Sequence, residues 1–185
     1  LPSFSAKLSE KTKFDLEKLG VEVLLNAPVK EVDSERIRLA SGENLSSGLN
    51  IWTAGVTGEP AMKTLNLPIE AGRISVSESL QVKDYPYVFA IGDIAGLKDK
   101  NGRYLPMVAP VAMQQARFVS KQISKLVNGA ELSRFEYIDK GSMATIGRHK
   151  AVVEVKGLRL SGVIAWYAWL WLHLFYLLGG RNKIG

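Results

Sequence analysis

The feature that most constrains this chain is an apolar run that ends in Gly-Asp and precedes an amphipathic helix. Residues 87–91 are almost continuously apolar, a pattern typical of a strand buried on both faces of a sheet. Gly92 and Asp93 end that run. Residues 110–127 then carry apolar side chains at steps of three and four, the period of a helix that packs one face. This order predicts an α/β sheet with a ligand site at the carboxyl end of the strand.

Shorter patterned segments fill the rest of the chain. Residues 9–19 predict a helix that is capped by Ser9 and ended by Gly20. Apolar or alternating runs between turn residues predict strands over 21–25, 29–32, 37–39, 49–53, 73–76, 143–146, 151–155 and 158–160. The closely spaced strands after the first helix favour an antiparallel meander at the end of an α/β nucleotide-binding domain.

The Gly-Asp pair has the chemistry of a ligand site. Gly92 allows a ligand to approach the backbone closely. Asp93 carries acceptors only, which suits the hydroxyl groups of a sugar or polyol. A strand followed by a capping or turn aspartate has the same two letters, so the surrounding residues have to decide between the two interpretations.

Those residues resemble a family of flavoproteins. Residues 88–95, VFAIGDIA, resemble the second FAD-binding motif of the two-dinucleotide-fold flavoproteins, in which the aspartate binds the ribityl chain of FAD. Residues 51–55, IWTAG, resemble the stretch that closes their NADH domain. Residues 105–115 and 141–148 are similar to segments of the type II NADH dehydrogenases. One departure is Pro110, where many members have Gln.

The resemblance implies a fold class and a domain order. The fold is α/β: part of an FAD/NAD(P)-binding two-dinucleotide fold, with an antiparallel meander and a C-terminal α+β membrane-associated section. Residues 1–55 would end the NADH-binding domain, 56–130 would be the C-terminal part of the FAD-binding domain, and 131–185 would be the truncated membrane-associated region. The chain has no G-x-G-x-x-G and no initiator Met. Since such enzymes need two glycine-rich phosphate loops, we expect a C-terminal fragment that is inactive alone.

The implied activity is electron transfer from NADH through FAD to membrane quinone, without proton pumping. Asp93 would bind FAD, and the start of the helix would present backbone N–H groups to the reduced flavin. The residues implied to bind FAD are Gly92, Asp93, Ala109, Pro110, Val111 and Ala112. Ala54 and Gly55 would lie near NADH, which is a substrate rather than a bound cofactor.

Quinone would contact Gln114, Gln115 and His173 according to the same resemblance. Two plainer interpretations stay open. The glutamines can be solvated residues one turn into the helix, and a lone histidine in an aromatic run is more often packed than catalytic.

The C-terminal part combines apolar and basic residues. Residues 141–185 hold six Lys or Arg, one acid and three of the four tryptophans. The aromatic residues lie together in 163–178 rather than among the bases, which favours a phospholipid surface over nucleic acid. That segment has a length of about 24 Å as a helix, shorter than a hydrocarbon core of about 30 Å. We expect it to dock peripherally on the cytoplasmic face of the inner membrane; a buried helix or a homodimer interface is the alternative.

Composition narrows the competing functions. The chain has no cysteine, which excludes disulfides and thiolate sites within it and disfavours a sulfide-quinone oxidoreductase. With two histidines, a histidine-rich metal site is not expected. The remaining alternatives are a non-catalytic membrane-docking module and another flavin-dependent quinone reductase of the same fold.

Overall fold

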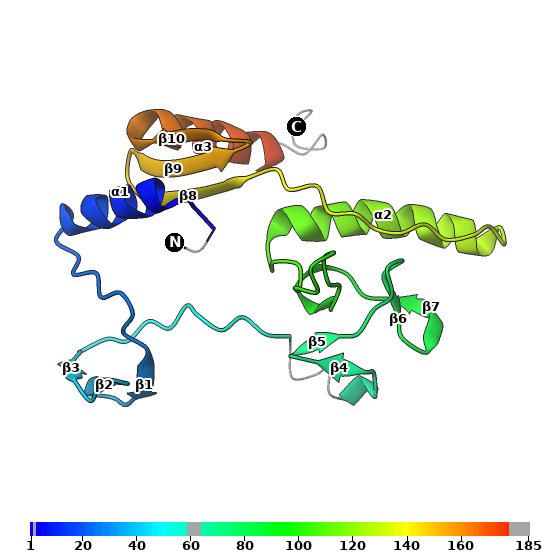
Figure 1. Cartoon of the computed structure of the whole chain (residues 1–185), viewed down its shortest axis with the longest axis horizontal. Coiled ribbons are helices and arrows are strands. Elements are labelled where there is room, and N and C mark those ends of the chain that lie inside the picture. The colour runs from blue at the N-terminus through cyan, green and yellow to red at the C-terminus, as the bar shows by residue number, and fades with distance from the viewer. Residues whose placement is uncertain (2, 59–63, 178–185) are drawn as a thin grey trace. The chain divides into compact units, whose positions relative to one another are not determined.

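The computed structural model describes residues 1, 3–58 and 64–177 (Figure 1). The chain divides into two units, one formed by Leu1–Ile51 with Lys140–Gly185 and the other by Trp52–Asp139. The domain boundaries predicted after residues 55 and 130 stay a prediction.

The first unit begins with helix α1, Ala6–Glu17. Ser5, with extended backbone, is its N-cap, so the predicted cap at Ser9 is wrong. The Ser9 N–H already donates to the Ser5 carbonyl, because the helical hydrogen bonding starts one turn earlier than the apolar pattern shows. The predicted strand over 21–25 is also wrong: among the described residues no strand pairs with this segment, and Leu25 is exposed.

Three short strands follow as the predicted antiparallel meander. They are β1 (Val29–Val32), β2 (Arg36–Leu39) and β3 (Asn44–Ser46), in the order β1-β2-β3. The sequence Asn-Leu-Ser is too short and polar to have predicted β3. The strand predicted over 49–53 is wrong, because these residues are extended coil with Ile51 and Trp52 exposed.

A three-stranded antiparallel sheet completes the first unit. It consists of β8 (Ser142–Gly147), β9 (Lys150–Val155) and β10 (Leu158–Ser161), with β9 in the centre. Helix α3, Gly162–Leu177, packs on the sheet through Ala165 and Trp166, which join Ala151 and Val153 in a hydrophobic cluster. These three strands and the helix confirm the sequence prediction.

Helix α1 is fastened to this sheet by a polar contact. The Ser5 N–H donates to Glu154 Oε2 at 2.7 Å, and Arg159 Nε pairs with the other oxygen at 2.8 Å. These groups lower the pKa of Glu154, with the Ser5 N–H the larger cause.

Leu178, Arg181 and Lys183, which belong to the predicted docking segment and its flank, lie outside the described residues.

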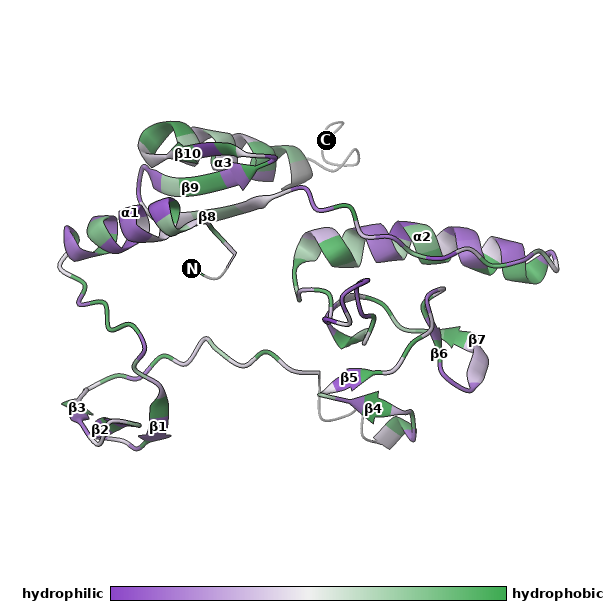
Figure 2. Ribbon diagram, in the orientation of Figure 1, coloured by the Kyte–Doolittle hydropathy of each residue, from purple (hydrophilic) through white to green (hydrophobic). Residues whose placement is uncertain are grey.

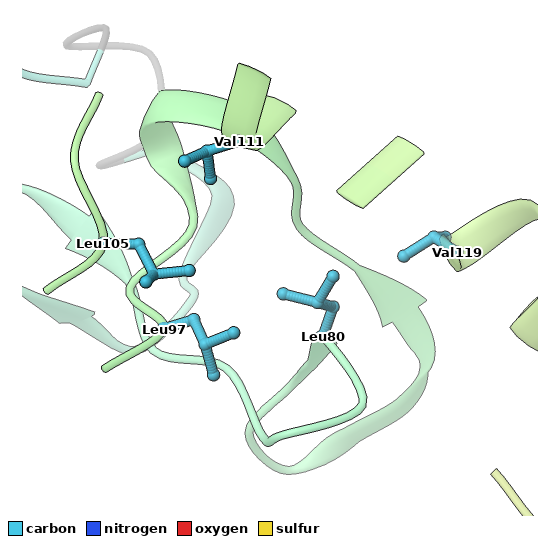
Figure 3. Packing of buried hydrophobic residues seen from close by; sticks show 5 residues of the cluster. All are labelled: Leu80, Leu97, Leu105, Val111 and Val119. Carbon is cyan, nitrogen blue, oxygen red and sulfur yellow. The ribbon is translucent and has the colours of Figure 1, made fainter. Parts of the chain in front are cut away.

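The second unit consists of two hairpins and a long helix. Strand β4 (Ile69–Glu70) pairs with β5 (Arg73–Ile74), and β6 (Gln81–Val82) pairs with β7 (Tyr85–Phe89). Helix α2, Ala109–Val127, alternates hydrophobic and hydrophilic residues (Figure 2) and confirms the predicted helix. Its apolar face closes a cluster formed by Leu80, Leu97, Leu105, Val111 and Val119 (Figure 3).

Strand β7 is less buried than its sequence predicts. Tyr87 is 81% exposed and Val88 is 40% exposed, so the expected burial on both faces is wrong for this chain. The reason is that, within the described residues, β7 pairs with the two-residue strand β6 alone. An apolar strand is buried only where neighbouring strands and helices cover it.

Glutamine side chains tie the segment after α2 back to the helix. Gln122 Oε1 accepts the Ser133 N–H at 2.7 Å. Phe135 stands edge-on to Phe118 of α2, with ring centroids 5.3 Å apart. The extended segment 130–139 therefore lies along α2 without forming a strand.

Candidate functional site

The Gly-Asp turn follows β7 and is anchored by the neighbouring hairpin. Gly92 has a φ of +74° and opens a single 3₁₀ turn, η2 (Gly92–Ile94). The Ala95 N–H closes this turn on the Gly92 carbonyl at 3.0 Å. Next along the chain, the Gly96 N–H donates to the carbonyl of Ile74 in β5 at 2.8 Å. The turn is thus held on its C-terminal side by backbone hydrogen bonds.

Asp93 presents a carboxylate with no partner among the described residues. It is exposed, and it forms no ion pair or hydrogen bond in the part of the chain that the structure describes. Asp99, six residues on, differs: the N–H groups of Arg103 and Asn101 occupy its carboxylate and lower its pKa. The two Asp93 oxygens are therefore available to a ligand that donates hydroxyl hydrogens.

The first turn of α2 lies beside Gly92. A Cβ added to Gly92 would lie 3.5 Å from the Cβ of Ala112. The Val108 carbonyl accepts the N–H groups of Val111 and Ala112 at 3.0 and 3.4 Å, and Pro110 has no N–H. Within the described residues this leaves Ala109 with the available N–H at the helix start.

The predicted cofactor-binding residues therefore fall into two groups. Gly92, Asp93 and Ala112 come together at the turn, with the Ala109 N–H at the start of α2. Val111 points into the hydrophobic cluster instead and is 3% exposed (Figure 3). Only its backbone takes part in the helix start.

Gln115 makes a contact that the sequence prediction missed. Its side chain is completely buried, and its Oε1 accepts the Gly92 N–H at 2.6 Å. Its Nε2 is buried without a partner among the described residues. The signal was present in the spacing: Val111, Gln115 and Val119 recur every four residues, which puts Gln115 on the buried face of the helix.

Gln114, the other predicted quinone residue of α2, is bonded at both ends of its amide. Its Nε2 donates to the Ile138 carbonyl at 3.0 Å, and its Oε1 accepts the Ile138 N–H at 3.1 Å. A quinone carbonyl that bonded Gln114 would have to take the place of one of these contacts. The role predicted for Gln114 stays a prediction.

The other predicted site residues lie elsewhere in the chain. His173 is exposed on α3 in the first unit, where its Nδ1 lies 2.7 Å from the Trp169 carbonyl and its ring stacks on Trp169 at 4.1 Å. Ala54 and Gly55 lie in exposed coil, with Gly55 at a φ of +77°. Their predicted contacts with quinone and NADH stay predictions.

A cavity of about 860 Å³ lies away from this turn. It is lined by residues 97–101, 103–106 and 134–137 together with Glu78 and Asp139. Its bases are neutralised in ion pairs: Lys98 with Glu70, Lys100 with Glu136, Arg103 with Asp99 and Arg134 with Glu78. The described residues contain no group of three or more His, Asp or Glu placed to hold a metal ion.

Comparisons with known proteins agree with these features. The family model for pyridine nucleotide-disulphide oxidoreductases matches residues 1–116. Two Mycobacterium tuberculosis proteins, the type II NADH:quinone oxidoreductases Ndh and NdhA, are 37% and 40% identical over 196 and 198 aligned residues. Each alignment covers 100% of this chain and 41% of the relative, so the chain spans less than half of their length.

A solved structure agrees on the fold. NDH2 from Plasmodium falciparum, in complex with NADH, aligns with a TM-score of 0.82 over 100% of this chain and 54% of its own. At 20% identity this likeness shows the fold alone. Together the comparisons confirm the α/β two-dinucleotide fold class and the resemblance to type II NADH dehydrogenases.

Proposed function

Because this chain belongs to the pyridine nucleotide-disulphide oxidoreductase family, we propose that it is part of an NADH:quinone oxidoreductase. It would contribute residues to the flavin site and to the quinone site of that enzyme. The observation that carries the proposal is the Asp93 carboxylate, which no described residue pairs with, in the turn that follows β7, next to Gly92 and near the start of α2. Identities of 37% and 40% to two type II enzymes, along the whole of this chain and 41% of each relative, support the choice of reaction within the family. The activity belongs to the whole protein, of which this chain supplies one part of the site.

The residues at the turn fit FAD. Asp93 offers acceptors for the ribityl hydroxyls, and Gly92 leaves the backbone open to close approach. The Ala109 N–H and the start of the α2 dipole would favour negative charge on the flavin ring. FAD held there would supply the redox chemistry, as an acceptor of hydride from NADH and a donor of electrons to quinone. The glycine-rich phosphate loops that such a site also needs are not among these 185 residues.

Substitution of Asp93 tests the proposed flavin site. In the full-length protein, Asp93→Asn removes the charge and keeps the side-chain size. We expect the variant to retain less flavin after purification, measured as the ratio of flavin absorbance to protein. Asp84→Asn is the matched control, since Asp84 lies at a φ of +68° in the β6–β7 turn, where Asn is well tolerated. Full flavin occupancy in Asp93→Asn would mean that the Asp93 carboxylate is not needed to bind the flavin.

The surface of α3 supports a membrane location. Its exposed apolar residues repeat at helical spacing along one stripe: Val163, Ile164, Tyr167, Trp171, Leu174 and Phe175. Trp171, 72% exposed, stacks on Phe175 with ring centroids 6.1 Å apart. Exposed apolar stripes of this kind are typical of binding surfaces. In the described part of the chain, no helix has both the length and the apolar character needed to span a bilayer.

An anionic phospholipid surface is the proposed partner of this stripe, on the cytoplasmic face of the inner membrane. Residues 141–177 contain four Lys or Arg and the single acid Glu154, so the segment that includes α3 has a net positive charge. Each exposed base near such a surface contributes about 1 kcal/mol. Tryptophan and tyrosine are the side chains that favour the headgroup boundary.

Co-sedimentation with liposomes tests the membrane proposal. The flavin-loaded full-length protein should bind anionic liposomes at low salt, bind less at high salt, and lose binding with Trp171→Glu. Val127→Glu is the control, because Val127 is 80% exposed, against 72% for Trp171, but lies at the end of α2. If the stripe instead forms a homodimer, Trp171→Glu will convert a dimer into a monomer and wild type will not sediment with liposomes.

A further inference from the structure

The buried amide of Gln115 has an unusual environment for a helix residue. Its Oε1 accepts the Gly92 N–H at 2.6 Å, and no atom of the side chain is exposed. Its Nε2 has no partner among the described residues. A buried amide with one unpaired half destabilises a fold relative to an apolar residue of the same size. The bond to Gly92 is therefore the feature that explains a glutamine at this position.

This hydrogen bond restrains Gly92, whose backbone no side chain restricts. Gly92, at a φ of +74°, has no side chain to restrict rotation between the Ile91–Gly92 peptide and Asp93. The nearest packing on it is loose, since an added Cβ would meet only the Ala112 methyl group at ordinary contact distance, 3.5 Å. The hydrogen bond from the Gly92 N–H to Gln115 fixes the orientation of the Ile91–Gly92 peptide, which carries that N–H, and ties the start of the turn to α2.

We infer that Gln115 is a positioning residue for the flavin site: it holds the Gly92 peptide so that the Asp93 carboxylate stays in place for the ribityl hydroxyls. This inference rests on the function proposed above. It differs from the prediction that Gln115 contacts quinone, because a completely buried side chain has no surface to offer a quinone. A residue that acts through Gly92 affects how tightly the flavin is held.

The test compares two buried glutamines of the same helix. Gln122 is 2% exposed and accepts the Ser133 N–H at 2.7 Å, so it makes the same kind of bond to a different segment. Methionine keeps the length of either side chain and removes the acceptor. In the full-length flavoprotein, Gln115→Met should raise the flavin dissociation rate by about tenfold, the effect of one buried hydrogen bond. Gln122→Met should lower the melting temperature without changing that rate per folded protein.

Three results would overturn the inference. The first is equal flavin dissociation from the two variants. The second is a raised quinone KM in Gln115→Met with flavin binding unchanged, which would indicate direct quinone contact. The third needs no variant: amide hydrogen exchange in the wild-type flavoprotein should find the Gly92 N–H protected, and fast exchange there would contradict the bond. A wild-type protein that binds no flavin would refute the proposed function itself, which separates the two failures.

Discussion

At the scale of single residues, Gly141 occupies a position before β8 where a larger residue would not fit. Its φ is +91°, a region that other residues enter at a cost of about 1–2 kcal/mol. A Cβ at this position would also overlap the Glu154 carbonyl oxygen and lie 2.8 Å from the Val155 Cα. These are backbone atoms of the central strand β9, so they cannot move aside cheaply. Gly157 has a similar φ of +86° but open space around it.

This pair gives a prediction with a built-in control. We expect Gly141→Ala to lower the free energy of unfolding by roughly 2–4 kcal/mol, and Gly157→Ala by roughly 1–2 kcal/mol. Urea denaturation of the two variants measures the difference. Equal destabilisation would mean that the sheet relaxes around the added methyl group.

At the scale of elements, Glu154 couples helix α1 to the sheet. Its carboxylate accepts the Ser5 N–H at the start of α1 and pairs with Arg159 of β10. The Ser5 N–H, and then Arg159, lower the pKa of Glu154 from its ordinary value of 4.5. Because the folded-state pKa lies below the unfolded one, this contact stabilises the fold fully above about pH 4.5 and is lost as pH falls through the folded-state pKa.

Glu154→Gln should therefore reduce stability in a pH-dependent way. The variant should unfold at lower urea than wild type near neutral pH, and the difference should shrink as the pH falls below the ordinary value of 4.5. Glu43→Gln is the control, since Glu43 is exposed and its side chain forms no ion pair among the described residues. A gap between wild type and Glu154→Gln that stays constant with pH would contradict the assignment.

Elements set by local sequence were predictable, and those set by distant pairing were not. Helix α2 and the hairpins β8–β9–β10 follow from periodicity and from turns within their own residues. Residues 21–25 and 49–53 have the composition of strands, yet a strand needs a neighbour, and the described chain supplies none. The site shows the same division: the Gly92-Asp93 motif was readable, whereas the bond from Gln115 to Gly92 joins residues 23 positions apart.

At the scale of the whole molecule, we propose one explanation for the exposed apolar segments and for the absence of glycine-rich phosphate loops from these 185 residues. Leu25, Ile51, Tyr87 and other large apolar residues are exposed in strands or in segments with strand composition. The curated relatives continue for more than half of their length beyond the part that matches this chain. In the full-length protein we expect the part that corresponds to this unmatched length to supply neighbouring strands and both glycine-rich loops.

The 185-residue chain by itself should therefore bind cofactors weakly. FAD and NADH are held largely through their phosphates at glycine-rich helix N-termini, which this sequence lacks. Titration calorimetry should find affinities weaker than micromolar for both, in a sample whose folding is verified by circular dichroism. Micromolar or tighter binding of FAD would mean that Asp93 and α2 suffice for a site.

We propose that this chain is part of an enzyme that passes electrons from NADH to quinone through a flavin. Anaerobic stopped-flow absorbance on the full-length protein tests it most directly. NADH should bleach the absorbance of the bound flavin, and quinone added afterwards should restore it. A flavin that NADH does not reduce, or a reduced flavin that quinone does not reoxidise, would contradict the proposed electron transfer.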